Sequence, residues 1–141
     1  MSESTVRGIV LAHGDMAQGL IDAVRHIAGV GGEALVAVSN RGLGPDAIAA
    51  EIHKHAGPEP TIVFTDLQSG SCGFAARRCL QNQPQMVVIS GVNLPMLLEF
   101  VMRRELPLEQ LVPFLLSKGR GAISCAPANL ENHEHRAVSR G

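Results

Sequence analysis

The strongest constraint on the fold is a regular alternation of short apolar runs with longer segments of helical spacing. The apolar runs cover residues 6–12, 34–38, 61–65 and 85–90. Each run is short and ends at a polar or glycine-containing turn, which is typical of a buried strand. Apolar residues then recur at helical spacing over about residues 16–28, 45–56, 71–81 and 96–104. This alternation predicts an α/β fold, doubly wound around a mainly parallel sheet.

The composition suits a sheet that is buried on both faces. Hydrophobic residues make up 45% of the 141 residues, and the only aromatic residues are four phenylalanines. The core is therefore expected to be aliphatic, as parallel sheets prefer. The pattern also predicts a fifth helix over residues 108–117, a turn at 119–121 and a short last strand at 122–125. We expect one domain over residues 1–126 and a polar C-terminal tail over residues 127–141.

Charge and hydropathy exclude several classes of protein. The net charge of −1 and the scarcity of aromatic residues argue against nucleic-acid binding. No apolar segment approaches the length needed to cross a bilayer, so we expect no direct membrane insertion. The first residues are polar and carry no signal-peptide pattern. Three cysteines (Cys72, Cys79 and Cys125) form no close pair, which favours reduced thiols and a cytoplasmic location.

The stretch over residues 9–20 joins the first strand to the first helix. The apolar run ends at His13, and Asp15 is expected to cap the helix that follows. The first N–H groups of a helix have no helical partner and favour anions. Gly19 lies inside this helix, where glycine costs about 1 kcal/mol relative to alanine. We expect it to permit close packing on the sheet.

Ligands of open parallel sheets bind beyond the carboxyl ends of the strands, where the winding reverses. For the common strand order 2-1-3-4, this reversal lies between the first and third strands. The first strand ends at His13 and the third at Asp66, which is followed by Ser69, Gly70 and Ser71 at a helix start. The topology therefore predicts that His13, Asp66 and Ser71 share one crevice.

These residue types suit reversible phosphorylation of a histidine. One ring nitrogen of His13 can act as a nucleophile, while Asp66 binds the other and fixes the tautomer. Ser71 and the neighbouring N–H groups can hold anionic oxygens. The alternatives are a structural histidine at a strand end, and an aspartate and a serine that only cap a turn and a helix.

Three segments carry a resemblance to a known family. Residues 12–20 read A-H-G-D-M-A-Q-G-L, similar to S-H-G-x-x-A-x-G-L in the family; residues 64–71 read F-T-D-L-Q-S-G-S, similar to D-L-x-G-G-S-P. Residues 90–99 read S-G-V-N-L-P-M-L-L-E, close to T-G-V-N-L-P-M-L-L-E. In this order and spacing, the chain resembles the enzyme IIA component of the mannose family of the bacterial sugar phosphotransferase system. The match extends over about residues 6–123.

The resemblance implies a phosphocarrier that uses no metal or cofactor. His13 would receive a phosphoryl group from the carrier HPr and pass it to an enzyme IIB partner, with Asp66 orienting the ring. Ser71, with Gly70 and Ser69, would bind the phosphoryl group. Asn93 would shape the crevice wall without touching the phosphate. The resemblance also implies a sheet of order 2-1-3-4 and a homodimer in which two subunits exchange the short strand at residues 122–125.

The sequence departs from the family pattern at several rim positions. Ser69 replaces a glycine, Cys72 a proline, and Phe74 a common asparagine. Ala12 and Ser90 also differ from the usual residues. These changes concern the pocket rim and the choice of partner. A thiol at a helix start can be reactive with a lowered pKa; the alternative for Cys72 is a small substitute for proline.

Other functions remain open from the sequence. The same histidine can serve a regulatory phospho-switch or binding module without a transport role, or a phosphocarrier subunit for dihydroxyacetone kinase. A hydrolase would use Ser71 as nucleophile, since residues 69–73 approach the G-x-S-x-G elbow. The short chain and the order His, Asp, Ser argue against that fold. The tail motif at residues 133–135, His-Glu-His, can bind a stray metal or simply be solvated.

Overall fold

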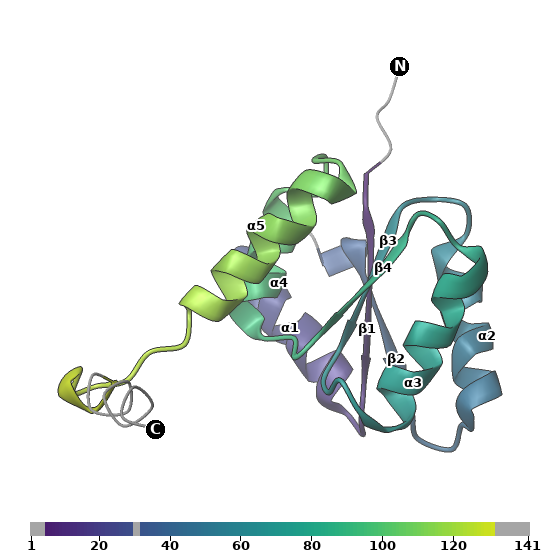
Figure 1. Cartoon of the computed structure of the whole chain (residues 1–141), viewed down its shortest axis with the longest axis horizontal. Helices are drawn as coiled ribbons and strands as arrows, with labels where there is room; N and C mark the ends of the chain where they lie inside the picture. The colour runs from purple at the N-terminus through teal and green to yellow at the C-terminus, as the bar shows by residue number, and fades with distance from the viewer. Residues whose placement is uncertain (1–4, 30–31, 132–141) are drawn as a thin grey trace, which may run out of the picture.

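The computed structural model describes residues 5–29 and 32–131 and contains one four-stranded parallel sheet (Figure 1). Its strands are β1 (Arg7–Ala12), β2 (Leu35–Ser39), β3 (Thr61–Thr65) and β4 (Met86–Ser90). Their order is β2-β1-β3-β4, with every neighbouring pair parallel. The predicted fold class and strand order are confirmed.

Helices cover both faces of the sheet and make three layers. On one face lie α1 (Met16–Ala28), α4 (Leu94–Met102) and α5 (Leu108–Gly121); on the other lie α2 (Pro45–Ala56) and α3 (Gly70–Arg78) (Figure 1). Two short 3₁₀ turns, η1 (Gly32–Ala34) and η2 (Cys79–Asn82), precede β2 and follow α3. No helix in the described part of the chain combines the length and apolar character that a bilayer crossing requires.

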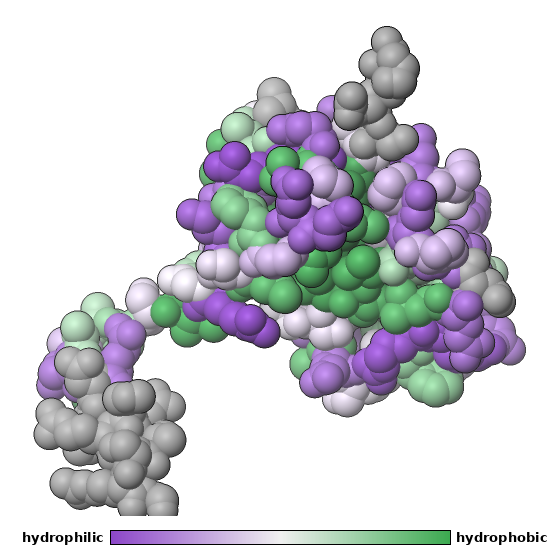
Figure 2. Space-filling view, turned by 45° about the horizontal axis from the view of Figure 1, so that its top comes forward, coloured by the Kyte–Doolittle hydropathy of each residue, from purple (hydrophilic) through white to green (hydrophobic). Residues whose placement is uncertain are grey.

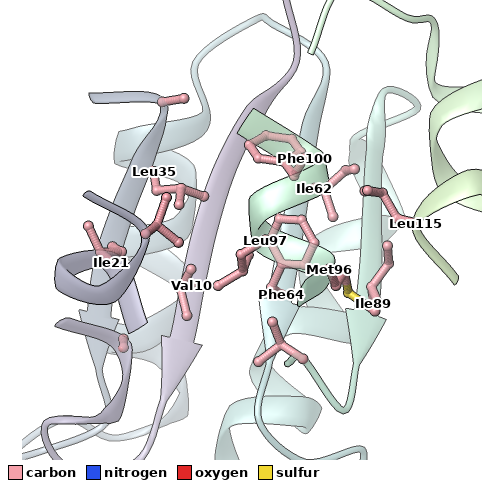
Figure 3. Close-up of a cluster of buried hydrophobic side chains, with 14 of the residues drawn as sticks. Val10, Ile21, Leu35, Ile62, Phe64, Ile89, Met96, Leu97, Phe100 and Leu115 are labelled. Atoms are coloured by element: carbon pink, nitrogen blue, oxygen red, sulfur yellow. The ribbon is translucent and has the colours of Figure 1, made fainter. Parts of the chain in front are cut away.

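Alternating residues of each strand point to opposite faces of the sheet and contribute to two separate hydrophobic cores. On the α1, α4 and α5 side, Val10 and Phe64 are fully buried, and Phe64 meets Phe100 edge to face at a centroid distance of 5.2 Å (Figure 3). On the α2 and α3 side, Leu11 and Val63 are equally buried among aliphatic side chains. Buried β-branched and leucine side chains on both faces explain why the strands read as continuous apolar runs.

The register of the strands brings three loops to one edge. Ala12 pairs with Ser39 of β2, and Leu11 pairs with Thr65 of β3. The three strands therefore end at the same level, and the residues that follow them meet at the carboxyl edge of the sheet. This edge is where the sequence places His13 and Asp66.

The C-terminal part differs from the prediction. Helix α5 continues through the expected turn at residues 119–121 and ends at Gly121. The reason is tertiary: the Gly119 carbonyl accepts a hydrogen bond from Asn93 Nδ2 at 2.9 Å, and a Cβ on Gly119 would lie 2.5 Å from Met96 Cε. Residues 122–125 form no strand within the single described chain, so the exchanged last strand stays a prediction. Most of the predicted tail, residues 132–141, lies outside the described residues.

Candidate functional site

His13 directly follows β1 and is held by Asp66, which directly follows β3. The His13 backbone N–H donates to Asp66 Oδ2 at 2.9 Å, and His13 Nδ1 lies 2.8 Å from the same oxygen. The His13 side chain is 43% exposed, whereas the Asp66 side chain is only 8% exposed. A buried carboxylate thus anchors an imidazole that solvent and a partner can reach.

Asp66 is fixed as a carboxylate by its surroundings. Burial by itself raises the pKa of Asp66, but hydrogen bonds from the His13 backbone and ring, and attraction to the His13 ring, outweigh it and hold the pKa below its usual value. The other carboxylate oxygen, Oδ1, accepts from the Leu67 N–H at 2.9 Å. Both oxygens are therefore engaged, and the charged form persists at neutral pH.

The second ring nitrogen of His13 faces the start of α3. A Cβ built on Gly70 would lie 4.0 Å from His13 Nε2, so the backbone of Gly70 passes beside this nitrogen. Gly70 is the first residue of α3 and has a φ of +89°, which glycine adopts without strain. Ser69 occupies the N-cap position with an extended backbone, and half-buried Ser71 follows Gly70. The free N–H groups of a helix start therefore lie next to Nε2.

Two residues of α3 hold the loop that connects Asp66 to this helix start. Gly73 packs against the loop so closely that a Cβ would overlap the carbonyl oxygen of Gln68 and lie 2.9 Å from its carbonyl carbon. The Arg77 guanidinium donates to the same carbonyl oxygen. Beneath the loop, the fully buried Thr65 donates through Oγ1 to the Leu67 carbonyl at 2.9 Å. The loop is fixed from both sides.

The end of β2 and the loop after it contribute residues that the sequence analysis did not single out. Asn40 Oδ1 accepts from the Gly14 N–H at 3.1 Å, and Ser39 Oγ donates to the Gly14 carbonyl at 2.8 Å. Asp15 does not cap α1; its carboxylate pairs with Arg41 at 3.0 Å. Their position in the sequence could have identified them, because residues at the end of the second strand reach the same sheet edge as His13.

Cys72 lies beside the histidine and the aspartate but is wholly buried. Its side chain is 0% exposed, and its Sγ lies within 4.8 Å of a His13 ring nitrogen and an Asp66 carboxylate oxygen. Burial and the charge of Asp66 raise the pKa of the Cys72 thiol, against a hydrogen bond with Ser71 that lowers it. Of the two interpretations of Cys72, the raised pKa and the burial contradict a reactive thiol and agree with a small buried residue in place of proline.

Asn93 serves the helices next to the site. Its Oδ1 accepts from the Met96 N–H at 3.0 Å and caps α4, while its Nδ2 donates to Gly119 of α5. Its side-chain hydrogen bonds therefore join α4 to α5, on the face of the sheet opposite α3. Asn93 can therefore affect the crevice only indirectly, by fixing the position of α4.

A sequence model of a family described as "PTS system fructose IIA component" matches residues 8–112. The chain belongs to the mannose/sorbose family of enzyme IIA (EIIA) components. EIIA proteins of this family are phosphocarriers in sugar uptake by the phosphotransferase system. The matched range contains His13, Asp66 and the residues of α3.

Individual EIIA proteins agree with this assignment. The sorbose-specific EIIA component of Klebsiella pneumoniae is 35% identical over 99 residues, which cover 68% of this chain and 73% of that protein. The structure of a mannose/sorbose-specific IIA subunit from Enterococcus faecalis has a TM-score of 0.76 at 30% identity, covering 86% of this chain and 94% of that one. An EIIA structure from Streptococcus agalactiae shares the fold, with a TM-score of 0.78 at 23% identity over 85% of this chain and 96% of that one.

Proposed function

We propose that His13 Nε2 accepts a phosphoryl group from phospho-HPr and donates it to an enzyme IIB partner. The observation that carries this proposal is the double attachment of His13 to Asp66 Oδ2, at 2.9 Å through the backbone and 2.8 Å through Nδ1. A proton on Nδ1 is directed at the carboxylate, so Nε2 keeps its lone pair. That lone pair faces the start of α3.

The transfer needs only an in-line displacement. The Nε2 lone pair forms a bond to phosphorus, the bond from phosphorus to the HPr ring nitrogen breaks, and that nitrogen keeps the electron pair. The Nδ1 proton stays on His13, where the Asp66 carboxylate stabilises the positive character of the ring. The reverse displacement by a group of enzyme IIB restores free His13. No metal is required, because the donor already holds an activated phosphoryl group.

The start of α3 supplies the groups that receive the phosphoryl oxygens. The first N–H groups of α3, those of Gly70 and Ser71, have no partner within the helix, and the Ser71 hydroxyl lies in the same turn, next to Ser69 at the N-cap. These donors are placed before the reaction begins, so their stabilisation costs little reorganisation. In this proposal Asn93 has only an indirect role.

The proposal includes a homodimer with exchange of residues 122–125. Sheet edge β4 has no further strand beside it in the described chain, and an apolar groove of about 800 Å³ adjoins it, with Val87, Leu106 and Val112 in its lining. Figure 2 shows hydrophobic side chains gathered on this side of the molecule. The chain after α5 leads away from the domain, and Ile123 is 76% exposed (Figure 1). A second copy can supply this segment to the edge.

The proposal assigns the phosphocarrier unit to residues 1–126 and treats residues 127–141 as a tail. It places the protein in the cytoplasm. Cys72, Cys79 and Cys125 are free thiols in the structure, as proteins of the reducing cytosol normally have.

A phosphotransfer assay tests the assignment. The protein is incubated with phosphoenolpyruvate, enzyme I and HPr, and its mass is read at neutral pH by mass spectrometry. We expect a gain of one acid-labile phosphoryl group, absent from a His13→Ala variant. Labelling of the His13→Ala protein at this pocket, or no labelling of the parent, would overturn the proposal.

A second stage separates transport from regulation. Addition of a mannose-family enzyme IIB is expected to discharge the phosphorylated protein. A phosphorylated protein that keeps its phosphoryl group with every such partner, but changes its binding to another protein, would favour the regulatory alternative.

A further inference from the structure

Three metal-binding side chains converge where the phosphoryl group is proposed to bind. One ring nitrogen of His13, one carboxylate oxygen of Asp66 and the Sγ of Cys72 all lie within 4.8 Å of one another. The three residues come from the ends of β1 and β3 and from the first turn of α3, elements that the sheet and core hold together. The donor set is therefore a product of the fold.

We propose that this set binds a zinc ion, and that the ion blocks phosphorylation of His13. A nitrogen, an oxygen and a sulfur donor form a ligand set that zinc accepts in proteins, and thiolate excludes magnesium and calcium as favoured ions. The His13 side chain is 43% exposed, so the histidine end of this ligand set is open to solvent, and a zinc ion held by three protein ligands commonly takes water as the fourth. The inhibitory part of this inference rests on the proposed phosphoryl acceptor.

The geometry requires only a small adjustment. Ligand atoms on one tetrahedral zinc ion lie roughly 3.3–3.8 Å apart, given bonds of about 2.0 Å to nitrogen and oxygen and 2.3 Å to sulfur. The Nδ1 of His13 and Oδ2 of Asp66 are already 2.8 Å apart, and the widest separation in the set is below 4.8 Å. A closure of about 1 Å at the widest pair, with an opening of about 0.5 Å between Nδ1 and Oδ2 where zinc binds Nδ1, would bring the three donor atoms to tetrahedral spacing.

Proton and charge balance favour occupancy by a divalent ion. Without metal, the site carries the negative charge of Asp66 and a protonated Cys72 thiol. Zinc binding replaces the thiol proton, which is released to solvent, and the occupied site is neutral. No oxidant or other reactant takes part.

The bound ion removes the nucleophile in either mode of attachment. If zinc binds Nε2, it occupies the nitrogen that attacks phosphorus. If zinc binds Nδ1, the ring proton moves to Nε2, which then has no lone pair for the attack. Zinc and the phosphoryl group therefore exclude each other.

Metal binding is tested on the full chain without any phosphotransferase partner. The protein is titrated with Zn²⁺ by calorimetry and with Co²⁺ by absorption spectroscopy. We expect one equivalent to bind with a thiolate-to-cobalt charge-transfer band in the near ultraviolet. Cys72→Ala is expected to lose the band and to bind zinc at least about tenfold more weakly, while the matched Cys125→Ala variant keeps both.

A control for the tail is needed because its His-Glu-His motif also offers metal ligands. A His133→Ala/His135→Ala variant is expected to retain the cobalt band and the single tight site. A band that disappears with the tail histidines, or zinc affinity unchanged in Cys72→Ala, would overturn the proposal.

Inhibition is then measured separately. Stoichiometric Zn²⁺ is expected to prevent labelling of the parent by phospho-HPr, with recovery on addition of EDTA. Cys72→Ala should be labelled at the same zinc concentration, which also verifies that enzyme I and HPr tolerate the metal. If the parent binds zinc at Cys72 but is never labelled even without zinc, the phosphocarrier proposal fails and the metal site stands. Full labelling of the zinc-loaded parent would refute the mutual exclusion.

Discussion

At the scale of single residues, one oxygen of Asp66 controls both the backbone and the ring of His13. Oδ2 accepts from the His13 N–H and bonds to Nδ1, while Oδ1 accepts from Leu67. The ring is thereby oriented and its tautomer set by a single buried group. An amide at position 66 can reproduce the shape but not the two acceptor oxygens or the charge.

An Asp66→Asn variant is therefore expected to lose phosphoryl acceptance by about 100-fold or more, since replacing an orienting carboxylate by an amide favours the wrong histidine tautomer. The measurement is the initial rate of labelling by phospho-HPr, followed by rapid-quench mass spectrometry. Asp22→Asn is the matched control, because Asp22 lies on the exposed surface of α1. Equal slowing of the two variants would contradict the orienting role.

The same carboxylate predicts a pH dependence of stability. The pKa of Asp66 is lower in the folded protein than the usual value of an aspartate, so folding favours the charged form. This contribution to the free energy of unfolding is complete well above about pH 4, the ordinary aspartate pKa, and is lost as the pH falls through the folded pKa. Urea unfolding from neutral to acid pH should show a steeper loss of stability for the parent than for Asp66→Asn. Parallel curves would be inconsistent with the lowered pKa.

Much of the site was predictable residue by residue, and the rest depends on packing. His13 and Asp66 directly follow strands, and the apolar runs in the sequence show where those strands end. The burial of Cys72 depends on the rotation of α3, which the sequence does not define. Asn40 lay in a predicted loop, yet its bond to Gly14 follows from the level at which adjacent strands end.

At the scale of elements, the start of α3 is shaped by its own second turn. Gly73 lets the Gln68 carbonyl approach the helix, and Arg77 donates to that carbonyl. The loop carrying Ser69 and Gly70 therefore packs directly against the backbone of α3 at Gly73, where there is no Cβ. Gly73 is needed for this close packing and not for a positive φ, unlike Gly70.

Two glycine-to-alanine variants are expected to have opposite effects. Gly73→Ala should displace the loop, destabilise the protein by about 1–3 kcal/mol and slow phosphorylation of His13. Gly19→Ala should stabilise it by about 0.5–1 kcal/mol, because Gly19 lies in α1 and a Cβ there would meet nothing within 4 Å. The expectation of close packing at Gly19 is wrong for that reason. Denaturant unfolding measures the stability of both variants, and the rate of labelling by phospho-HPr measures phosphorylation. If Gly73→Ala changed neither the stability nor the rate, the position of the loop would be unimportant.

Element boundaries were less predictable than element identities. The glycines at 119 and 121 are typical of a turn, yet α5 runs through them because Gly119 fits against Met96 and binds Asn93. Helix α3 ends at Arg78 and gives way to a 3₁₀ turn within the predicted helix. In both cases the outcome depends on contacts between distant segments.

At the scale of the whole molecule, the open edge beside β4 predicts association. We expect a dimer in light scattering after size-exclusion chromatography. Ile123→Asp should shift it towards monomer, because a charge would enter an apolar groove. Leu43→Asp is the control, since Leu43 is 37% exposed and follows β2, the opposite edge of the sheet. A parent that is monomeric at all concentrations would refute the exchange.

The overall architecture was the most predictable level. Four apolar runs and the helices between them define a doubly wound sheet, and the reversal between the first and third strands locates the crevice. What covers the β4 edge is a property of two chains, and no pattern within a single sequence encodes it. The apolar groove beside β4 is the surface that a second chain would cover.

The attachment of His13 to Asp66 spans 53 residues and exists only when β1 lies beside β3. A nascent chain that has not yet delivered β3 offers no oriented imidazole, and a molecule in which these strands separate loses it again. If His13 is the phosphoryl acceptor, as proposed, acceptance of a phosphoryl group requires a complete central sheet. On that proposal, incompletely folded molecules would accept no phosphoryl group and so would not hold it back from the transfer chain.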